Sequence, residues 1–168
     1  MANVPERRSR LRQYQVQLLE RMQAAKTGVA EGGRELGVMI GGRLCLLDLT
    51  QISEIVPLQT ATPVPLTQDW YLGLANIRGH LTGVIDLARY RQYGGGDAAP
   101  AERRLITFAP GLGFNCALLV ERVLGLRKLA GMEAVADDEF RDGEGQSWLR
   151  IDLAQLVQEP RFVQVGLV

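Results

Sequence analysis

The N-terminal part of the chain has the hydrophobic pattern of an amphipathic helix. Over Pro5–Lys26 the apolar residues recur at steps of three and four, which places them on one helical face. They are Leu11, Tyr14, Leu18, Met22 and Ala25. Arginine and glutamine cover the other faces, and glycines end the pattern at Gly28, Gly32 and Gly33. The pattern predicts a helical arm within residues 1–34, which either packs on its own domain or contacts a partner or a membrane surface.

After Glu35 the helical spacing gives way to short apolar runs that are typical of strands. Leu36–Ile40 and Arg43–Leu49 flank Gly41-Gly42, a pair that suits the positive φ angles of a two-residue hairpin turn. Asp86 is the predicted N-cap of a short helix. The rest of this half is predicted to contain, in order, a strand over 51–56, a proline-rich loop over 57–70, strands over 71–77 and 81–85, and that helix over 86–93.

The second half of the chain follows a similar order of elements. Residues 94–100 are rich in glycine and alanine and are typical of a flexible linker. After them we predict a strand over 104–109, a turn over 110–113, a strand-like run over 114–129 with a break near Gly125, an acidic loop over 130–145, a strand over 146–151 and a short helix over 152–158 capped by Asp152.

An internal duplication relates the two halves. A shift of 71 places Cys45 on Cys116 and Leu47 on Leu118, with matching apolar spacing on either side. A shift of 66 places Ile85-Asp86-Leu87-Ala88 on 151–154 without a mismatch. Each half then has about five short strands, a number that favours a small closed barrel. Two such barrels packed together would share a core.

The charge of the chain is divided between the arm and the body. The whole sequence of 168 residues is neutral, with 19 cations and 19 acids. Residues 1–34 hold seven cations and three acids, a net charge of +4, which leaves −4 for the body. This balance argues against a nucleic-acid binder driven by bulk charge. No apolar run approaches the roughly 20 residues that a membrane span needs, and no secretory signal is present, so we expect a cytoplasmic protein without membrane insertion.

The chain offers few groups for catalysis or metal binding. His80 is the only histidine, and we expect it to be an exposed turn residue because it follows Gly79 between two strands. Cys45 and Cys116 lie in apolar runs and are expected to be buried structural thiols. We therefore predict no catalytic residue, no cofactor and no metal site. The alternative function is a small β-barrel nucleic-acid module with a basic arm, although aromatic residues make up only 6% of the chain.

One stretch resembles the signature of CheW-type chemotaxis coupling proteins. In that family a turn with the sequence Asn-Leu-Arg-Gly leads into an apolar strand that ends in Ile-Asp-Leu. This chain has 76–79 with Ile77 in place of leucine, followed by Ile85-Asp86-Leu87. Thr82-Gly83 stands where the family often has an apolar residue and proline, and the glycine is expected to loosen the strand. Segment 117–125 resembles a further family segment, with Glu121 in its usual aspartate position.

The resemblance implies a mainly β fold of two SH3-like five-stranded barrels packed together, with the N-terminal amphipathic helix added. The CheW-like domain would be 35–168, with barrel one at about 35–93, the linker at 94–100, barrel two at about 101–158 and a short C-terminal tail. It also implies a non-enzymatic adaptor that binds the cytoplasmic tip of a methyl-accepting chemoreceptor and the regulatory domain of a CheA-type histidine kinase. Such an adaptor would be cytoplasmic, at membrane-associated receptor arrays.

The resemblance also assigns three receptor-binding residues and suggests a branch of the family. Arg78 matches the arginine of the turn, and Ile52 and Glu54 match an apolar and an acidic groove residue. Each has a structural alternative, since Arg78 can be a solvated turn charge, Ile52 plain core and Glu54 a surface acid. The kinase-binding residues are not assigned. The basic arm and residues 70–76 look like the pilus-associated, PilI-like branch, which implies control of type IV pilus twitching motility.

Overall fold

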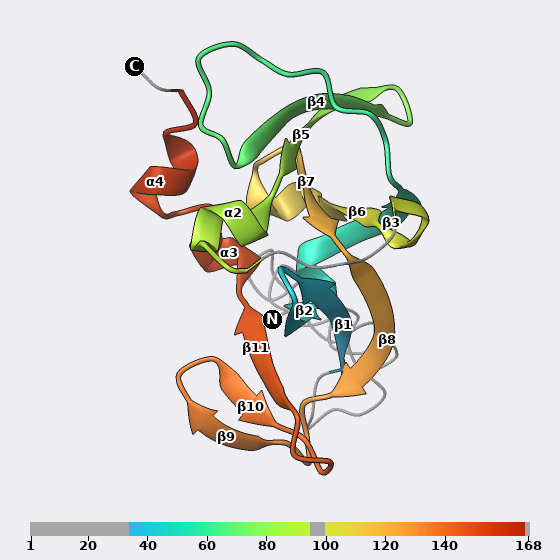
Figure 1. The fold of residues 1–168 in the computed structure, drawn as a ribbon, viewed down its shortest axis with the longest axis vertical. Coiled ribbons are helices and arrows are strands. Elements are labelled where there is room, and N and C mark those ends of the chain that lie inside the picture. Colours follow the sequence, from blue (N-terminus) through green and yellow to red (C-terminus); the bar gives the residue numbers. More distant parts are fainter. Residues whose placement is uncertain (1–33, 95–99, 167–168) are drawn as a thin grey trace, which may run out of the picture.

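The computed structural model describes residues 34–94 and 100–166. This part of the chain is mainly β, with two sheets and a few short helices (Figure 1). None of the helices in it is both long and apolar enough to cross a membrane. The amphipathic helix predicted over 5–26 lies outside the described residues.

The first half folds as the hydrophobic pattern predicts. In the turn between the first two strands, Gly41 and Gly42 have φ angles of 58° and 75°. These angles suit the two-residue turn that the Gly-Gly pair predicted. The elements are β1 (Arg34–Ile40), β2 (Arg43–Asp48), a 3₁₀ turn (Leu49–Gln51), β3 (Ile52–Pro57), β4 (Tyr71–Ile77), β5 (His80–Ile85) and α2 (Leu87–Arg91). Asp86 caps α2 by accepting a hydrogen bond from the amide of Arg89.

The second half differs from the prediction in three places. Its elements are a 3₁₀ turn (Pro100–Glu102), β6 (Arg104–Phe108), a second 3₁₀ turn (Pro110–Leu112), β7 (Cys116–Val120), β8 (Arg122–Lys128), β9 (Glu133–Ala136), β10 (Glu139–Arg141), β11 (Ser147–Ile151), α3 (Leu153–Leu156) and α4 (Pro160–Val163). The break predicted near Gly125 is at Glu121, because the chain leaves one sheet there and enters the other. Gly125 lies within β8, opposite Gly37.

The other two differences are elements that carry almost no hydrophobic pattern. The predicted acidic loop 130–145 contains the β9–β10 hairpin, and all four residues of β9 are exposed, so no alternation marks it as a strand. The predicted C-terminal tail contains α4, which is too short to show a helical period. Phe162 of α4 is buried and stacks on Trp70, 5.6 Å between ring centroids, so this segment is part of the core.

Each sheet takes strands from both halves of the chain. We call residues 34–94 unit one and residues 100–166 unit two. The six-stranded sheet has the order β8-β1-β2-β11-β10-β9, and the five-stranded sheet has the order β3-β6-β7-β5-β4. Unit one thus gives its first hairpin to one sheet and its later strands to the other, and unit two does the reverse (Figure 1). The sheets are therefore shared between the two ranges predicted as separate barrels.

The strand register confirms the internal duplication. In the parallel pair β2–β11, Cys45 lies opposite Leu149. In the parallel pair β5–β7, Cys116 lies opposite Gly83. These two pairs are related by the shifts of 71 and 66 that align the halves of the sequence, so the duplication extends to the pairing between strands.

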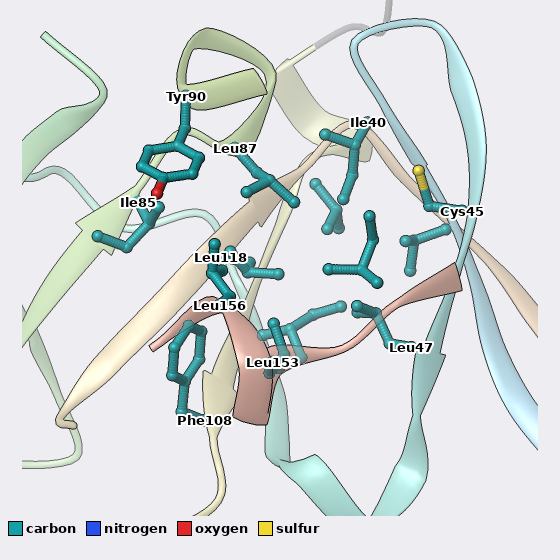
Figure 2. Packing of buried hydrophobic residues seen from close by; sticks show 14 of the residues in the cluster. Ile40, Cys45, Leu47, Ile85, Leu87, Tyr90, Phe108, Leu118, Leu153 and Leu156 are labelled. Carbon is teal, nitrogen blue, oxygen red and sulfur yellow. The ribbon is translucent and has the colours of Figure 1, made fainter. Parts of the chain in front are cut away.

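The main core lies between the two sheets and belongs equally to both units. Eighteen buried residues form it, nine from each unit. Figure 2 shows Cys45, Leu47 and Ile85 of unit one beside Leu118 and other residues of unit two. A smaller apolar cluster fills the inside of the five-stranded sheet.

Gly83 does not leave its strand loosely packed, contrary to our expectation. A Cβ atom at this position would lie 2.8 Å from the ring of Tyr71. The ring of Tyr71 therefore occupies the space that a side chain at Gly83 would need, and β5 is covered there by an aromatic residue of β4.

The two cysteines have the surroundings of structural thiols. Both are free, Cys45 is fully buried in the main core, and Cys116 is half-buried at its edge. Burial raises the pKa of Cys45 to about 12 and that of Cys116 to about 11. A thiol reacts as its thiolate, so both groups are protonated and weakly nucleophilic near neutral pH.

We predict that both cysteines resist alkylation in the folded protein at mildly alkaline pH. In urea their pKa returns to the usual value of about 8.5, and both should then react rapidly with iodoacetamide. Mass spectrometry of time points with and without urea measures the two rates. Cys116 should be the faster of the two under native conditions, and rapid native modification of Cys45 would contradict the structure.

Candidate functional site

Two of the three predicted receptor-binding residues meet at the rim of an open groove. Arg78 and Glu54 form an ion pair at its rim. The groove has a volume of about 520 Å³, and we call it the Arg78 groove. His80 also lies on the rim, while Phe108 and Phe114 supply apolar lining.

The β4–β5 hairpin presents Arg78 to solvent. Ile77 and His80 pair with each other, so Arg78 and Gly79 are the two central residues of a tight turn. Their φ angles are 52° and 83°. A positive φ is uncommon for arginine, and the side chain of Asn76 stabilises the turn by accepting a hydrogen bond of 2.8 Å from the amide of Gly79. The Arg78 side chain is 70% exposed.

A bulge in β3 presents Glu54. The pairing of β3 with β6 is irregular between Ile52 and Ile55, so Ser53 and Glu54 have no partner residues in the ladder. The hydroxyl of Thr107 fills this gap by accepting a hydrogen bond of 2.9 Å from the amide of Glu54. Bulges commonly re-aim a side chain, and this one directs Glu54 towards Arg78.

Ile52 lies outside the groove. It pairs with Phe108 at the start of β3, and its half-buried side chain packs against the main core. The structure therefore brings together Glu54 and Arg78 and places Ile52 on the core side of the same strand. Its contact with a receptor stays a prediction.

Unit two contributes a wall of the groove that the sequence did not reveal. Phe114 and Asn115 follow the turn at 110–113, which we interpreted only as a connection between strands. The Asn115 side-chain amide donates a hydrogen bond to the carbonyl of Leu81. The backbone carbonyl of Asn115 accepts a hydrogen bond of 3.0 Å from the backbone amide of Gly83. A polar residue after a glycine turn carries no signal by itself, and only the parallel pairing of β5 with β7 brings it to the site.

The groove has the character of a protein-binding surface. Aromatic rings offer apolar area, and the rim supplies an arginine fork and a carboxylate that can exchange partners with an incoming polypeptide. Within residues 34–94 and 100–166, no cluster of three His, Cys, Asp or Glu side chains is arranged to hold a metal ion.

Similarities to known proteins agree with this geometry. The CheW-like domain family matches residues 35–161 of the chain. Protein PilI of Pseudomonas aeruginosa is 26% identical over 145 residues, which cover 79% of this chain and 79% of that protein.

A solved structure has the same fold. The scaffolding protein TtCheW from Thermoanaerobacter tengcongensis is 22% identical, and its crystal structure aligns with a TM-score of 0.61 over 76% of this chain and 93% of that one. The mainly β architecture and the resemblance seen in the sequence are thereby confirmed. The family match spans most of the chain, including the Arg78 turn, and the chain therefore belongs to the CheW-like domain family.

Proposed function

We propose that the chain is a non-enzymatic adaptor that couples chemoreceptors to a CheA-type histidine kinase. The observation that carries the proposal is the Arg78 groove. Glu54 comes from the bulge in β3 and Arg78 from the β4–β5 turn. Both match the family's receptor-binding positions, and they pair at the rim of one open groove. Family membership supports an adaptor over the alternative of a nucleic-acid module.

The receptor tip would bind the groove as a helical segment. Its apolar side chains would cover Phe114, in the manner of an amphipathic helix laid into a groove. A glutamate or glutamine of the receptor would then replace Glu54 as the partner of Arg78, whose guanidinium offers donors in a planar fork. Ile52 would add an apolar contact at the edge of the core. Arg78 keeps a partner throughout the exchange, and the exposed Glu54 carboxylate is released to solvent, so no charge is buried without compensation.

The kinase and the cellular process complete the proposal. The regulatory domain of the kinase would bind a surface outside the Arg78 groove, so that one adaptor can hold both partners. Similarity to Protein PilI supports a role in a chemosensory system for type IV pilus twitching motility. The adaptor would reach membrane-associated arrays through its receptor, and the basic arm within 1–34 would contact a partner.

We predict that Arg78→Glu weakens binding of the cognate receptor tip by about tenfold or more, because the new carboxylate lies beside Glu54 and repels acidic groups of the receptor. Isothermal titration calorimetry measures the affinity, and thermal unfolding checks that the exposed turn still folds. The matched control is Arg122→Glu, at an exposed arginine paired with exposed Glu102. That control should change receptor affinity by no more than about twofold. Equal affinity of the Arg78 variant and the wild type would refute the role of Arg78.

We also predict direct binding of the chain to the regulatory domain of its cognate CheA-type kinase. Calorimetry with the purified domain should give a saturable 1:1 isotherm that Arg78→Glu leaves unchanged. No interaction with any such kinase of the same genome would contradict the adaptor function. A salt-dependent shift of labelled RNA or DNA by the protein would instead support the nucleic-acid alternative.

A further inference from the structure

The two units are held together by sheet formation itself. Within unit one the ladders join only β1 to β2 and β4 to β5, and within unit two they join only β6 to β7 and the strands β9, β10 and β11. The remaining ladders, β1–β8, β2–β11, β3–β6 and β5–β7, all cross between units. Either unit alone would leave these strand edges and its half of the main core unpaired.

The two halves of this interface are equivalent in register. Leu36 lies opposite Leu126 in β1–β8, and Ile106 lies opposite Ile55 in β6–β3. Both ladders contain an irregularity close to these pairs. Both ends of the interface therefore use the same backbone pattern. Hydrogen bonds between strands alone do not decide whether unit one pairs with unit two or whether two copies of the same unit pair.

One set of equivalent side chains does make that distinction. Glu35 of unit one is buried on the face of the six-stranded sheet that points away from the main core. It lies opposite Asp48 and pairs with Arg150 of unit two. The Glu35 Oε1 to Arg150 Nε distance is 2.6 Å. We call Glu35, Asp48 and Arg150 the charged trio. The equivalent positions of the five-stranded sheet hold an apolar trio in the smaller apolar cluster, which consists, in the same order, of Leu105, Leu119 and Val84.

These two trios exclude pairs of like units. If two copies of unit one associated, Glu35 of one copy would meet Val84 of the other copy at the place of Arg150. If two copies of unit two associated, Arg150 of one copy would meet Leu105 of the other copy at the place of Glu35. The first arrangement buries Glu35 without a cation, and the second places the half-buried Arg150 against apolar groups without a carboxylate. Both cost more than a complete ion pair or a complete apolar contact. Burial raises the pKa of Glu35 even with Arg150 beside it, so little water reaches this position.

We propose that the two units are separable and specific binding partners, in which unit one recognises unit two, of the same chain or of a second copy, and Glu35 with Arg150 selects the unlike pair. Two further contacts strengthen the match. The Gln51 side chain donates to Asp152 at 2.8 Å and accepts from the amide of Leu153 at 2.7 Å, so unit one caps the start of α3. The Arg78 groove is then a composite site, since Arg78 comes from unit one and Phe114 from unit two.

The first experiment cuts the connection between the units in the folded, full-length chain. A protease site is inserted within residues 95–99, the protein is cleaved under native conditions, and its mass is followed by light scattering after gel filtration. We expect a single 1:1 particle, both directly after cleavage and after unfolding in urea and refolding. Separation or aggregation of the fragments in native buffer would overturn the proposal.

The second experiment tests which units pair. Cleaved protein with an affinity tag on unit one is mixed with cleaved untagged protein, unfolded in urea and refolded together. The tag should recover unit two and no untagged unit one. Recovery of untagged unit one would overturn the assigned selectivity.

The third experiment tests Glu35 and Arg150 directly, by anisotropy of a label on unit one in the cleaved protein. Arg150→Val, which installs the residue of the equivalent position, should weaken association by at least ~100-fold. Adding Glu35→Leu should restore part of the lost affinity, because it removes the buried carboxylate that Arg150→Val leaves unpaired, while Asp48 stays partly exposed. Arg122→Val, at an exposed pair within unit two, is the matched control and should have little effect. A double variant no tighter than Arg150→Val would refute the role of the ion pair.

These measurements contain no receptor, so their failure would leave the adaptor function standing. The composite nature of the groove alone rests on the proposed function. It predicts that cleaved protein binds the receptor tip only while both units are associated, and binding by isolated unit one would contradict it.

Discussion

The parallel pairing of β2 with β11 and of β5 with β7 is the constraint on which the rest of the structure depends. Parallel neighbours cannot be joined by a tight turn, and here each of these strands takes its parallel partner from the other unit. The consequence is that neither sheet can form before both units are present. The main core follows from this, because the two sheets pack against each other through faces that carry an equal number of buried residues from each unit.

The same pairing makes the functional surface. Arg78 stands on a turn of unit one, and Glu54 is directed towards it by a bulge that the hydroxyl of Thr107 in unit two completes. Asn115 fixes the neighbouring wall by bonding to β5. A surface built in this way is rigid, because every groove residue lies on or beside a strand held by the core, and rigid elements position a binding site more accurately than free loops.

The sequence was sufficient for local structure and insufficient for the exchange of strands. Gly41-Gly42 predicted its hairpin and Asp86 its helix, since both depend on backbone geometry within a few residues. Alternation of apolar residues indicates which face of a strand is buried, but it does not identify the neighbouring strand. The pairing of Glu35 with Arg150 was therefore invisible in the sequence. β9 and α4 were missed because one is wholly exposed and the other is a single turn.

The receptor site was predicted through the family motif, and physical pattern alone would not have found it. Glu54 and Arg78 were assigned separately, and only the fold shows that they form a pair. Ile52 occupies the expected strand and packs against the core, so its assignment as a receptor contact stays a prediction.

Divergence of the duplicated units explains why, in the described part of the chain, the Arg78 groove differs from the equivalent region of the six-stranded sheet. The positions equivalent to Glu54 and Thr107 are Gly125 and Gly37, which lie opposite each other in β8 and β1. The position equivalent to the small, buried Thr82 is Trp148, and a Cβ atom at Gly37 would lie 3.1 Å from its ring. A side chain at Gly37 would therefore crowd the tryptophan ring that fills the inside of the six-stranded sheet. In the five-stranded sheet the smaller Thr82 leaves room for the side chain of Thr107. The hydroxyl of Thr107 supports the bulge that carries Glu54. One exchange of side-chain volume thus separates the five-stranded sheet, which presents a charged rim, from the six-stranded sheet, which buries Glu35.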